Sequence, residues 1–347
     1  MDPGTVAGDS GWSYRTLMFI VTLGGIFILS TLIGILSSGI EEKLQQLRKG
    51  RSFVVESDHQ LILGWSSKIF TIISELAIAN ENQRKPRIVV MAKEDKTVME
   101  DEIRDKCPEL YNTKVICRTG NPNDIVDLNI VNPEEAKSII VLAPENDDDA
   151  DAQTIKNLLA IVNNPQRKEN SYHIVAEMKE EKNLEIGKIV GKDEVELLLS
   201  DDLISRIMVQ TCRQSGLSVV YTSLTEFDGD EIYIVDEPKI IGKTFGEALF
   251  KYNDSTIIGI QNANGQTQIN PPMDTVFEKG SKIIGITEDD DTLIMNAPES
   301  IQVDDSAIKN LDHEEMVKEN TLILGWNKKG ANILREMSNY VLGDSEI

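Results

Sequence analysis

The chain has 347 residues, enough for two or three domains, and a formal net charge of −23 from 35 Lys+Arg and 58 Asp+Glu. This acidic balance argues against a nucleic-acid partner, because phosphates require a basic surface. The three cysteines and three histidines are scattered along the chain. The sequence therefore predicts no disulfide framework, no zinc-type centre and no enzyme active site.

Residues 17–40 form an uncharged run of 24 residues. Such a run spans about 36 Å as a helix, which is long enough to cross the apolar core of a bilayer. A buried helix of a soluble protein and a secretory signal are the alternatives. A signal has a basic start, whereas Asp2 and Asp9 precede this run. We therefore predict a membrane-spanning helix in contact with lipid.

The charges that flank this run predict its orientation. Most of the cations follow it, with Lys43, Arg48, Lys49 and Arg51 on that side against Arg15 on the other. The positive-inside rule then places the C-terminal domains in the cytoplasm. Gly24 and Gly25, in the middle of the run, permit a bend or the close approach of another helix.

The rest of the chain shows a repeated unit. Residues 59–77 predict a short apolar strand, a turn at Gly64 and an amphipathic helix, and residues 320–338 predict the same series. The string LILGW occurs in both copies, which indicates a duplication. Between the copies, strands alternate with helices: strands at 87–91, 114–117, 138–142 and 173–176, and helices at 96–107, 122–129 and 149–162. This alternation predicts an α/β fold with a doubly wound, mainly parallel sheet.

The predicted organisation has seven parts. They are an outer loop at 1–16, the membrane helix at 17–40, a linker at 41–57, a Rossmann-like domain at 58–200, a helix within 201–218, a small α+β module at 219–297 and the start of a second Rossmann-like domain at 319–347. One βα unit cannot close a core, so we expect the chain to be truncated at both ends.

A ligand crevice is expected beyond the C-terminal ends of the strands. The candidate residues there are Gly64, Trp65, Ser66, Ser67, Glu94, Arg118 and Gly120. The first turn keeps one glycine of the G-x-G-x-x-G fingerprint, and the bulky Trp65 stands close to the path of a pyrophosphate. The turn therefore argues against NAD as a cofactor, which leaves a degenerate structural turn or another ligand.

An acidic run follows the strand at 138–142. Its carboxylates could coordinate Ca²⁺, and the candidate ligands are Asp147, Asp148, Asp149 and Asp151. The same acids could instead stabilise the first turn of the next helix through its dipole. The spacing does not match an EF-hand loop, so both interpretations stay open.

The helix expected at 201–214 carries Leu203, Ile204, Ile207 and Met208 on one face. An apolar stripe at a domain boundary needs a partner that buries it. We therefore predict a dimerisation surface formed by Ile204, Ile207 and Met208.

Together these pieces resemble ion channels gated by RCK (regulator of K⁺ conductance) domains, and more closely the CASTOR/POLLUX group, known from plant nuclear envelopes and with prokaryotic relatives. The matching strings are DPG at 2–4, SSGIEEKLQQLRKG at 37–50, HQLILGW at 59–65, VICRTGNP at 115–122, AKSIIVLAPENDDDAD at 136–151 and DLISRIMVQ at 202–210.

This resemblance implies a subunit of a ligand-gated, K⁺- or Ca²⁺-permeable channel that assembles as a homotetramer from RCK dimers. Asp2, Pro3 and Gly4 would belong to the selectivity filter, and residues 17–40 would form the inner helix with a gating bend at Gly24 and Gly25. Residues 201–214 would be the helix that pairs two subunits, and the module after it would resemble the C-terminal subdomain of RCK and TrkA proteins.

The chain also departs from this pattern. The TVGYG signature of K⁺ channels is missing at the filter position, which leaves ion selectivity open. The outer helices and most of a second RCK domain are also missing. A membrane-anchored, TrkA-like regulatory nucleotide-binding protein without its own pore is therefore the alternative. The host membrane would be a prokaryotic plasma membrane or a nuclear envelope.

Overall fold

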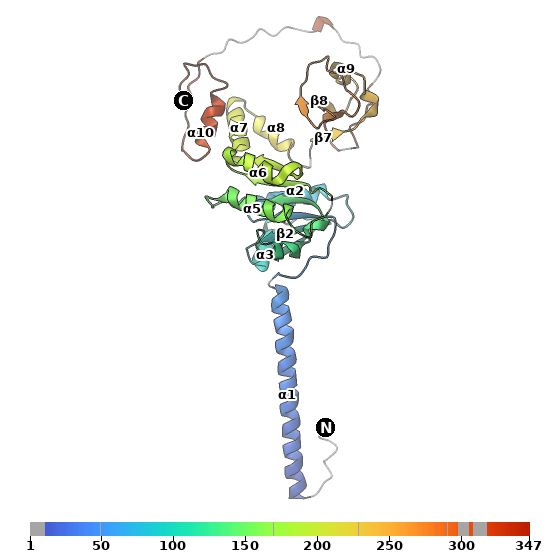
Figure 1. The fold of residues 1–347 in the computed structure, drawn as a ribbon, viewed down its shortest axis with the longest axis vertical. Helices are drawn as coiled ribbons and strands as arrows, with labels where there is room; N and C mark the ends of the chain where they lie inside the picture. The colour runs from blue at the N-terminus through green and yellow to red at the C-terminus, as the bar shows by residue number, and fades with distance from the viewer. Residues whose placement is uncertain are drawn as a thin grey trace.

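A computed structural model describes residues 11–48, 50–168, 170–227, 229–289, 291–297, 305–307 and 318–347, with the side chains of 41–48 left aside. Helix α1 (Trp12–Arg48) projects as one long helix from the rest of the protein (Figure 1). It begins inside the loop expected at 1–16 and runs past the expected end of the membrane helix. The polar continuation EEKLQQLR consists largely of good helix formers and so prolongs the helix.

The body next to α1 contains a six-stranded sheet. Its order is β3-β2-β1-β4-β5-β6, and all neighbouring strands are parallel. This arrangement confirms the doubly wound parallel sheet. The strands are β1 (His59–Leu63), β2 (Arg87–Ala92), β3 (Lys114–Thr119), β4 (Ala136–Val141), β5 (Ile174–Met178) and β6 (Val195–Leu199).

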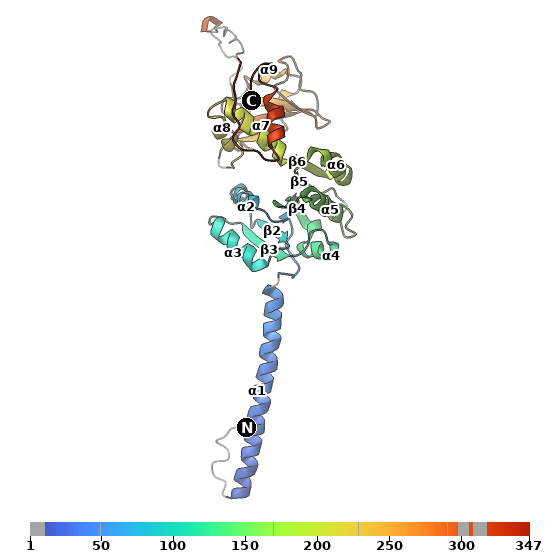
Figure 2. The ribbon, with the colours of Figure 1, turned by 90° about the vertical axis from the view of Figure 1, so that its left-hand side faces the viewer.

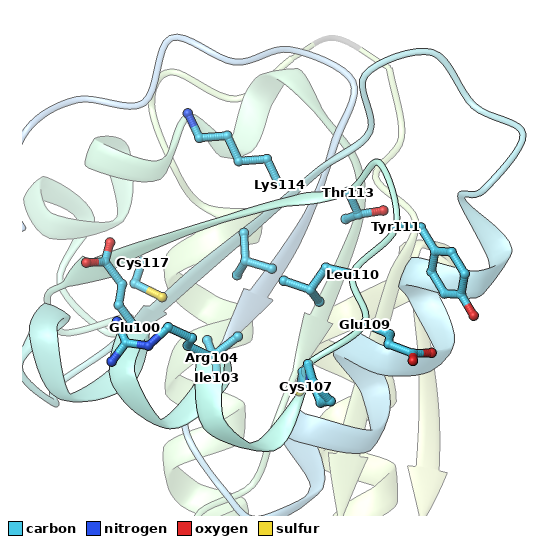
Figure 3. A pocket seen from close by; sticks show the side chains of 12 residues that line it. Glu100, Ile103, Arg104, Cys107, Glu109, Leu110, Tyr111, Thr113, Lys114 and Cys117 are labelled. Carbon is cyan, nitrogen blue, oxygen red and sulfur yellow. The ribbon is translucent and has the colours of Figure 1, made fainter.

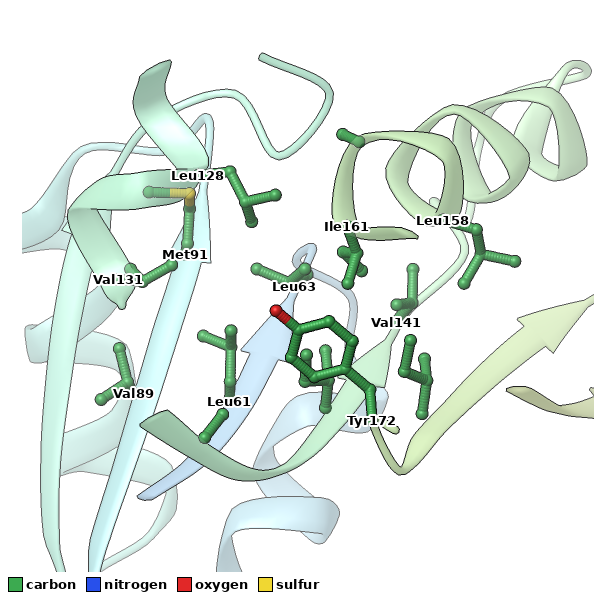
Figure 4. Close-up of a cluster of buried hydrophobic side chains, with 14 of the residues drawn as sticks. Leu61, Leu63, Val89, Met91, Leu128, Val131, Val141, Leu158, Ile161 and Tyr172 are labelled. Atoms are coloured by element: carbon green, nitrogen blue, oxygen red, sulfur yellow. The ribbon is translucent and has the colours of Figure 1, made fainter. Parts of the chain in front are cut away.

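Side chains that alternate along β1 separate two apolar layers. Leu61 and Leu63 lie in one cluster with residues of α4 (Ile125–Leu128) and α5 (Ala150–Val162), as Figure 4 shows. Ile62 lies in the other cluster with residues of α2 (Lys68–Ala79) and α3 (Lys96–Lys106). Helices therefore cover both faces, as a parallel sheet with apolar strands requires.

Three details differ from the sequence-based expectations. The helix expected at 122–129 is reduced to α4, because Asp124 caps it by accepting a hydrogen bond from the Val126 N–H. Helix α6 (Leu184–Gly191) and strand β6 were not expected. Short 3₁₀ turns occur at Asn129–Val131, Pro133–Glu135, Glu181–Asn183, Lys192–Glu194, Pro238–Ile240 and Asp305–Ala307.

Beyond the sheet the chain forms α7 (Ser200–Arg213) and α8 (Leu217–Ser223), and then a small module. Its antiparallel sheet has the order β7-β10-β8-β9 and packs around Phe245 of α9 (Phe245–Ala248) and Phe277. The strands are β7 (Glu231–Val235), β8 (Thr256–Gln261), β9 (Thr267–Ile269) and β10 (Lys282–Thr287).

The second copy of the repeat is only partly formed as expected. Its helix α10 (Gly330–Met337) is present and packs against α7, beside which it lies in Figures 1 and 2. The strand expected before the turn of this copy is wrong, since the residues that precede Gly325 form no strand and Leu322 and Leu324 are 80% and 86% exposed. A parallel strand needs neighbours, and among the described residues this segment has one parallel bridge nearby, between Asn320 and Glu346.

Candidate functional site

The crevice of the six-stranded sheet lies at the C-terminal ends of its central strands. There the strand order reverses between β1 and β4, which is where open α/β sheets bind ligands. A cavity of about 140 Å³ occupies this position. Its walls come from the segments after β1, β2, β3 and β4 and from α5: Gly64, Trp65, Ala92, Lys93, Glu94, Asn121, Pro122, Asn123, Leu142, Pro144, Asp147, Gln153 and Asn157.

The turn after β1 is built on Gly64. Its φ of +108° lies in the left-handed region, and a Cβ there would lie 2.8 Å from the Leu142 carbonyl oxygen. Its N–H donates to the Met91 carbonyl at 2.9 Å. Only glycine fits this turn, which explains why the first glycine of the nucleotide fingerprint is kept although the others are lost.

Trp65 forms the next part of the wall. Its ring packs edge-on against Phe70 of α2, with centroids 5.6 Å apart and an interplanar angle of 87°. The indole is therefore held by packing within the fold, in a geometry that aromatic pairs favour.

The N-terminus of α2 is in contact with a carboxylate from the opposite side of the crevice. Ser67 is the N-cap residue, and its N–H donates to Glu145 Oε1 at 2.8 Å. The Ser67 hydroxyl donates to the same oxygen and is the main reason why the pKa of Glu145 is lowered. Glu145 follows β4, and the sequence analysis gave it no role.

A second charged group ties α2 to the centre of the sheet. Lys68, the first residue of α2, forms an ion pair with Glu177, a buried residue of β5. Glu177 also accepts hydrogen bonds from the Ala143 N–H at 3.2 Å and from the Ser200 hydroxyl at 2.7 Å. Buried carboxylates require such partners. The signal in the sequence that points to Glu177 is a carboxylate inside an otherwise apolar strand.

The structure places three of the seven predicted crevice residues in the cavity wall: Gly64, Trp65 and Glu94. Ser66 is buried beneath the turn, and Ser67 is bonded to Glu145. Gly120 packs against Met91, whose Cε would lie 2.9 Å from a Cβ at that position. Arg118 holds the segment after α1 instead, and burial lowers its pKa.

That segment is bonded closely to the turn after β3. The Gly50 carbonyl accepts from the Thr119 N–H at 3.2 Å, and the Ser52 carbonyl accepts from Arg118 Nε at 2.7 Å. Arg51 forms an ion pair with Asp127 of α4. The other Asp127 oxygen accepts from the Asn121 N–H at 2.9 Å. Because Asn121 lines the cavity, the polypeptide that leaves α1 is joined to the crevice wall.

Further along, Val54 anchors the same segment in the core. Its side chain is 5% exposed and lies in the cluster shared with Leu61, and its N–H donates to the Ile130 carbonyl at 2.7 Å. This attachment joins residues far apart in the chain, so no local sequence pattern predicts it.

The acidic loop after β4 faces a larger, neighbouring cleft of about 1300 Å³, which shares Asp147 with the wall of the crevice cavity. Asp151 is buried and accepts hydrogen bonds from the Lys179 N–H, the Glu180 N–H and the Asn183 side chain at 2.7–3.0 Å. Asp148 is exposed and lies 3.2 Å from the Lys328 ammonium. Asp147 accepts from the Asp149 N–H, and Asp149 is the N-cap residue of α5.

These four acids do not form one cluster in the described chain, where no group of three metal-ligating side chains is found. Five lysines line the same cleft and offset its negative charge: Lys68, Lys179, Lys182, Lys328 and Lys329. The Ca²⁺ site stays a prediction that would require further ligands.

In the described chain, the segment Trp12–Ile40 of α1 is the one stretch long and apolar enough to cross a membrane, and its apolar window is entirely unburied. Gly24 and Gly25 lie within an uninterrupted helix, so the gating bend stays a prediction. A Cβ at either glycine would meet no described atom within 4 Å. Asp2, Pro3 and Gly4 lie outside the described residues.

Helix α7 presents two different faces. One face meets α10 through ion pairs of Arg206 with Glu336 at 3.3 Å and of Asp202 with Arg335 at 3.3 Å. The predicted dimerisation residues remain accessible: Ile204 is 37% and Met208 52% exposed, and Ile207 is half-buried. The apolar stripe therefore exists and is open to a partner.

A further hollow of about 910 Å³ lies between α3 and β3, away from the crevice (Figure 3). Its wall includes Cys107 and Cys117, both buried. Burial raises the pKa of the Cys117 thiol to about 12, so this cysteine stays protonated and unreactive at neutral pH.

Two family models match the chain. Residues 201–304 match the model described as "Castor and Pollux, part of voltage-gated ion channel", and residues 55–176 match the "Calcium-activated potassium channel slowpoke-like RCK domain". A solved structure of the human SLO3 gating ring shares the fold, with a TM-score of 0.53 and 17% identity over 83% of this chain and 57% of that chain.

Curated relatives are similar along the entire chain. The probable ion channel POLLUX of Oryza sativa subsp. japonica is 33% identical over 350 residues, which are 100% of this chain and 36% of the relative. The ion channel CASTOR of Lotus japonicus is 34% identical over 349 residues, which are 100% of this chain and 40% of the relative. The chain thus spans less than half of either relative.

These relatives are named as ion channels, in agreement with the expectation that the chain is not an enzyme. Together with the apolar α1, they point to a membrane protein. Since the similarity runs from end to end and residues 201–304 match a model described for Castor and Pollux, the chain is a homologue of the CASTOR and POLLUX ion channels.

Proposed function

We propose that the chain is part of a cation-channel subunit in which the RCK body acts on α1 as the inner helix of the pore. The observation that carries this proposal is the attachment of residues 50–52 to Arg118, Thr119 and Asp127. Relatives named as ion channels support it.

The attachment suggests how a ligand opens the pore. The turn after β3 carries Asn121 in the crevice wall, and the Asn121 N–H donates to Asp127 of α4, which pairs with Arg51. A ligand that enters the crevice displaces this turn, and the displacement passes to Arg51 and to α1. Gly50, Arg51 and Ser52 each bond to residues of β3 or α4, which favours transmission of the motion to the segment that follows α1.

The remaining features of this proposal come from the sequence. Residues 1–16 lie near the outer mouth with Asp2, Pro3 and Gly4 in the filter, and the domains after α1 lie in the cytoplasm. Four chains surround the pore, paired through α7. The free space around Gly24 and Gly25 lets helices of neighbouring subunits approach or bend at this level. Conducted ions are K⁺ or Ca²⁺.

Recording from planar bilayers that contain the full-length protein tests this function. We expect single-channel cation currents, with reversal potentials in K⁺ and Ca²⁺ gradients giving the selectivity. Asp127→Asn should change the open probability and leave the single-channel conductance unchanged, because Asp127 lies outside the pore. Asp101→Asn, which removes an exposed acid of α3, is the matched control. Absence of any current from well-folded protein would favour the membrane-anchored regulator instead.

A further inference from the structure

Helix N-termini in Rossmann-like folds attract anions. The first N–H groups of a helix lack partners within the helix, and the helix dipole favours negative charge there. A bound pyrophosphate uses this property at the turn after the first strand. In this protein α2 occupies that position, and it has twelve residues.

The α2 N-terminus already holds an anion, and the anion is a side chain of the same protein. Glu145 Oε1 accepts from both the N–H and the hydroxyl of Ser67, 78 residues away in sequence. The Ser67 hydroxyl makes no cap bond within its own helix. The carboxylate therefore satisfies groups that would otherwise face a ligand phosphate.

The loop that carries Glu145 is tied down on its far side. Lys179 donates through Nζ to the Pro144 carbonyl and to the Glu145 carbonyl, the latter at 3.1 Å. Lys68, which could otherwise attract a phosphate at the same helix start, is paired with the buried Glu177. Both positive side chains near the α2 N-terminus are thus engaged within the protein.

Glu145 and Lys68 border the larger cleft of the acidic loop, next to the 140 Å³ cavity of the crevice. That cavity is also unsuited to phosphate. Two carboxylates, Glu94 and Asp147, contribute to its wall against one lysine, Lys93. Its volume of about 140 Å³ is below the roughly 300 Å³ at which small-molecule sites begin, so a dinucleotide does not fit in it as it stands.

We propose that Glu145 is the specificity-determining residue of this crevice. It acts as a built-in anion that occupies the phosphate position on α2, so the crevice accepts uncharged or cationic ligands and refuses phosphate-bearing ones. The ligand preference of the crevice does not depend on the proposed channel function. Its role in regulation rests on that function.

Binding of two phosphate probes tests this inference. Inorganic pyrophosphate and ADP are titrated by calorimetry into the whole chain in detergent micelles, with EDTA present so that no metal complex of the probe contributes. We expect no saturable binding by the wild-type chain at millimolar probe. Glu145→Gln and Glu145→Ala should bind about tenfold tighter or better, because the Ser67 donors are released from a competing charge.

The matched control is Asp148→Asn, which removes one charge from the same loop without touching α2. Its side chain is 99% exposed and lies against Lys328. Equal gains in Asp148→Asn and Glu145→Gln would overturn the proposal, since net charge would then explain the effect. The proposal would also be overturned if the wild type bound the probes as tightly as the Glu145 variants. It would be overturned as well if variants with the melting temperature of the wild type bound the probes no more tightly than the wild type. These outcomes are independent of ion currents, so a failure here is distinct from a failure of the channel function.

Discussion

Arg51 and Asp127 form an ion pair between the segment that leaves α1 and helix α4. The Asp127 side chain is 13% exposed, and its second oxygen is held by the Asn121 N–H. The pair therefore joins the apolar helix to the wall of the crevice, and its partners lie 76 residues apart in the sequence.

The first prediction concerns this attachment. Asp127→Ala should free Arg51 and loosen residues 50–52, which costs roughly 1 kcal/mol of local stability. Tryptic cleavage after Arg51 should therefore be several-fold faster than in the wild type, as followed by mass spectrometry of the N-terminal fragment. Asp101→Ala, which breaks an exposed pair with Arg104 on α3, should leave the rate unchanged. Equal rates in all three proteins would show that the attachment is not tight.

The second prediction tests the turn after β1. Gly64→Ala should destabilise the protein by roughly 2–4 kcal/mol, because its positive φ adds to a clash with the Leu142 carbonyl. Gly216→Ala is the control, since Gly216 also has a positive φ of +88° but open space around it. It should cost about 1 kcal/mol. Urea unfolding followed by circular dichroism measures both, and equal losses would remove the steric argument.

The third prediction is a pH dependence at His59. The side chain is fully buried, and burial lowers its pKa from the ordinary value of 6.5. In the folded state the imidazole therefore stays neutral at pH values where the unfolded chain has already bound a proton. Unfolding then takes up a proton, so stability should fall as the pH drops below about 6.5 towards the folded-state pKa.

Comparison of wild type with His59→Gln checks this effect. The free energy of unfolding measured between pH 7 and pH 5 should fall less steeply in the variant, in which no imidazole titrates at this site. Parallel slopes in the two proteins would assign the acid sensitivity to other groups.

The fourth prediction concerns the apolar stripe of α7. Residues 52–347 should stay folded without α1, since none of the apolar window of α1 is buried and its removal takes away no core residue. This part of the chain should dimerise through the stripe. Ile207→Glu should give monomers in sedimentation velocity, because a buried charge at the interface is costly. Ile189→Glu is the control on α6, where Ile189 is 70% exposed. A dimeric Ile207→Glu protein would place the interface elsewhere.

The last prediction combines calcium with assembly. Because the described acids form no cluster within one chain, a Ca²⁺ site at the acidic loop needs carboxylates from a neighbouring subunit. Ca²⁺ but not Mg²⁺ should then raise the melting temperature of residues 52–347, and Asp147→Asn with Asp149→Asn should abolish the rise. The rise should also vanish in Ile207→Glu. An unchanged melting curve would leave these acids as charges at the start of α5.

Local sequence patterns were sufficient to predict most of the elements and the α/β class of the fold. The uncharged run at 17–40 predicted the apolar part of α1, and apolar strands that alternate with helices predicted the parallel sheet, because these patterns follow from local periodicity. Gly64 was recognisable as the turn residue because it separates an apolar strand from an amphipathic helix. The strand expected in the second copy of the repeat did not form, since a short apolar segment forms a strand only beside neighbouring strands, and the exposed Leu322 and Leu324 have none among the described residues.

The contacts that build the crevice depend on the packing of distant parts of the chain. Glu145 reaches Ser67 from the far side of the strand-order reversal, and Arg118 turns from the expected crevice to the Ser52 carbonyl. Both contacts join residues more than sixty positions apart, at 78 and 66 positions. Such pairings are set by the packing of the whole sheet, because local periodicity carries no information about which loops meet at its edge.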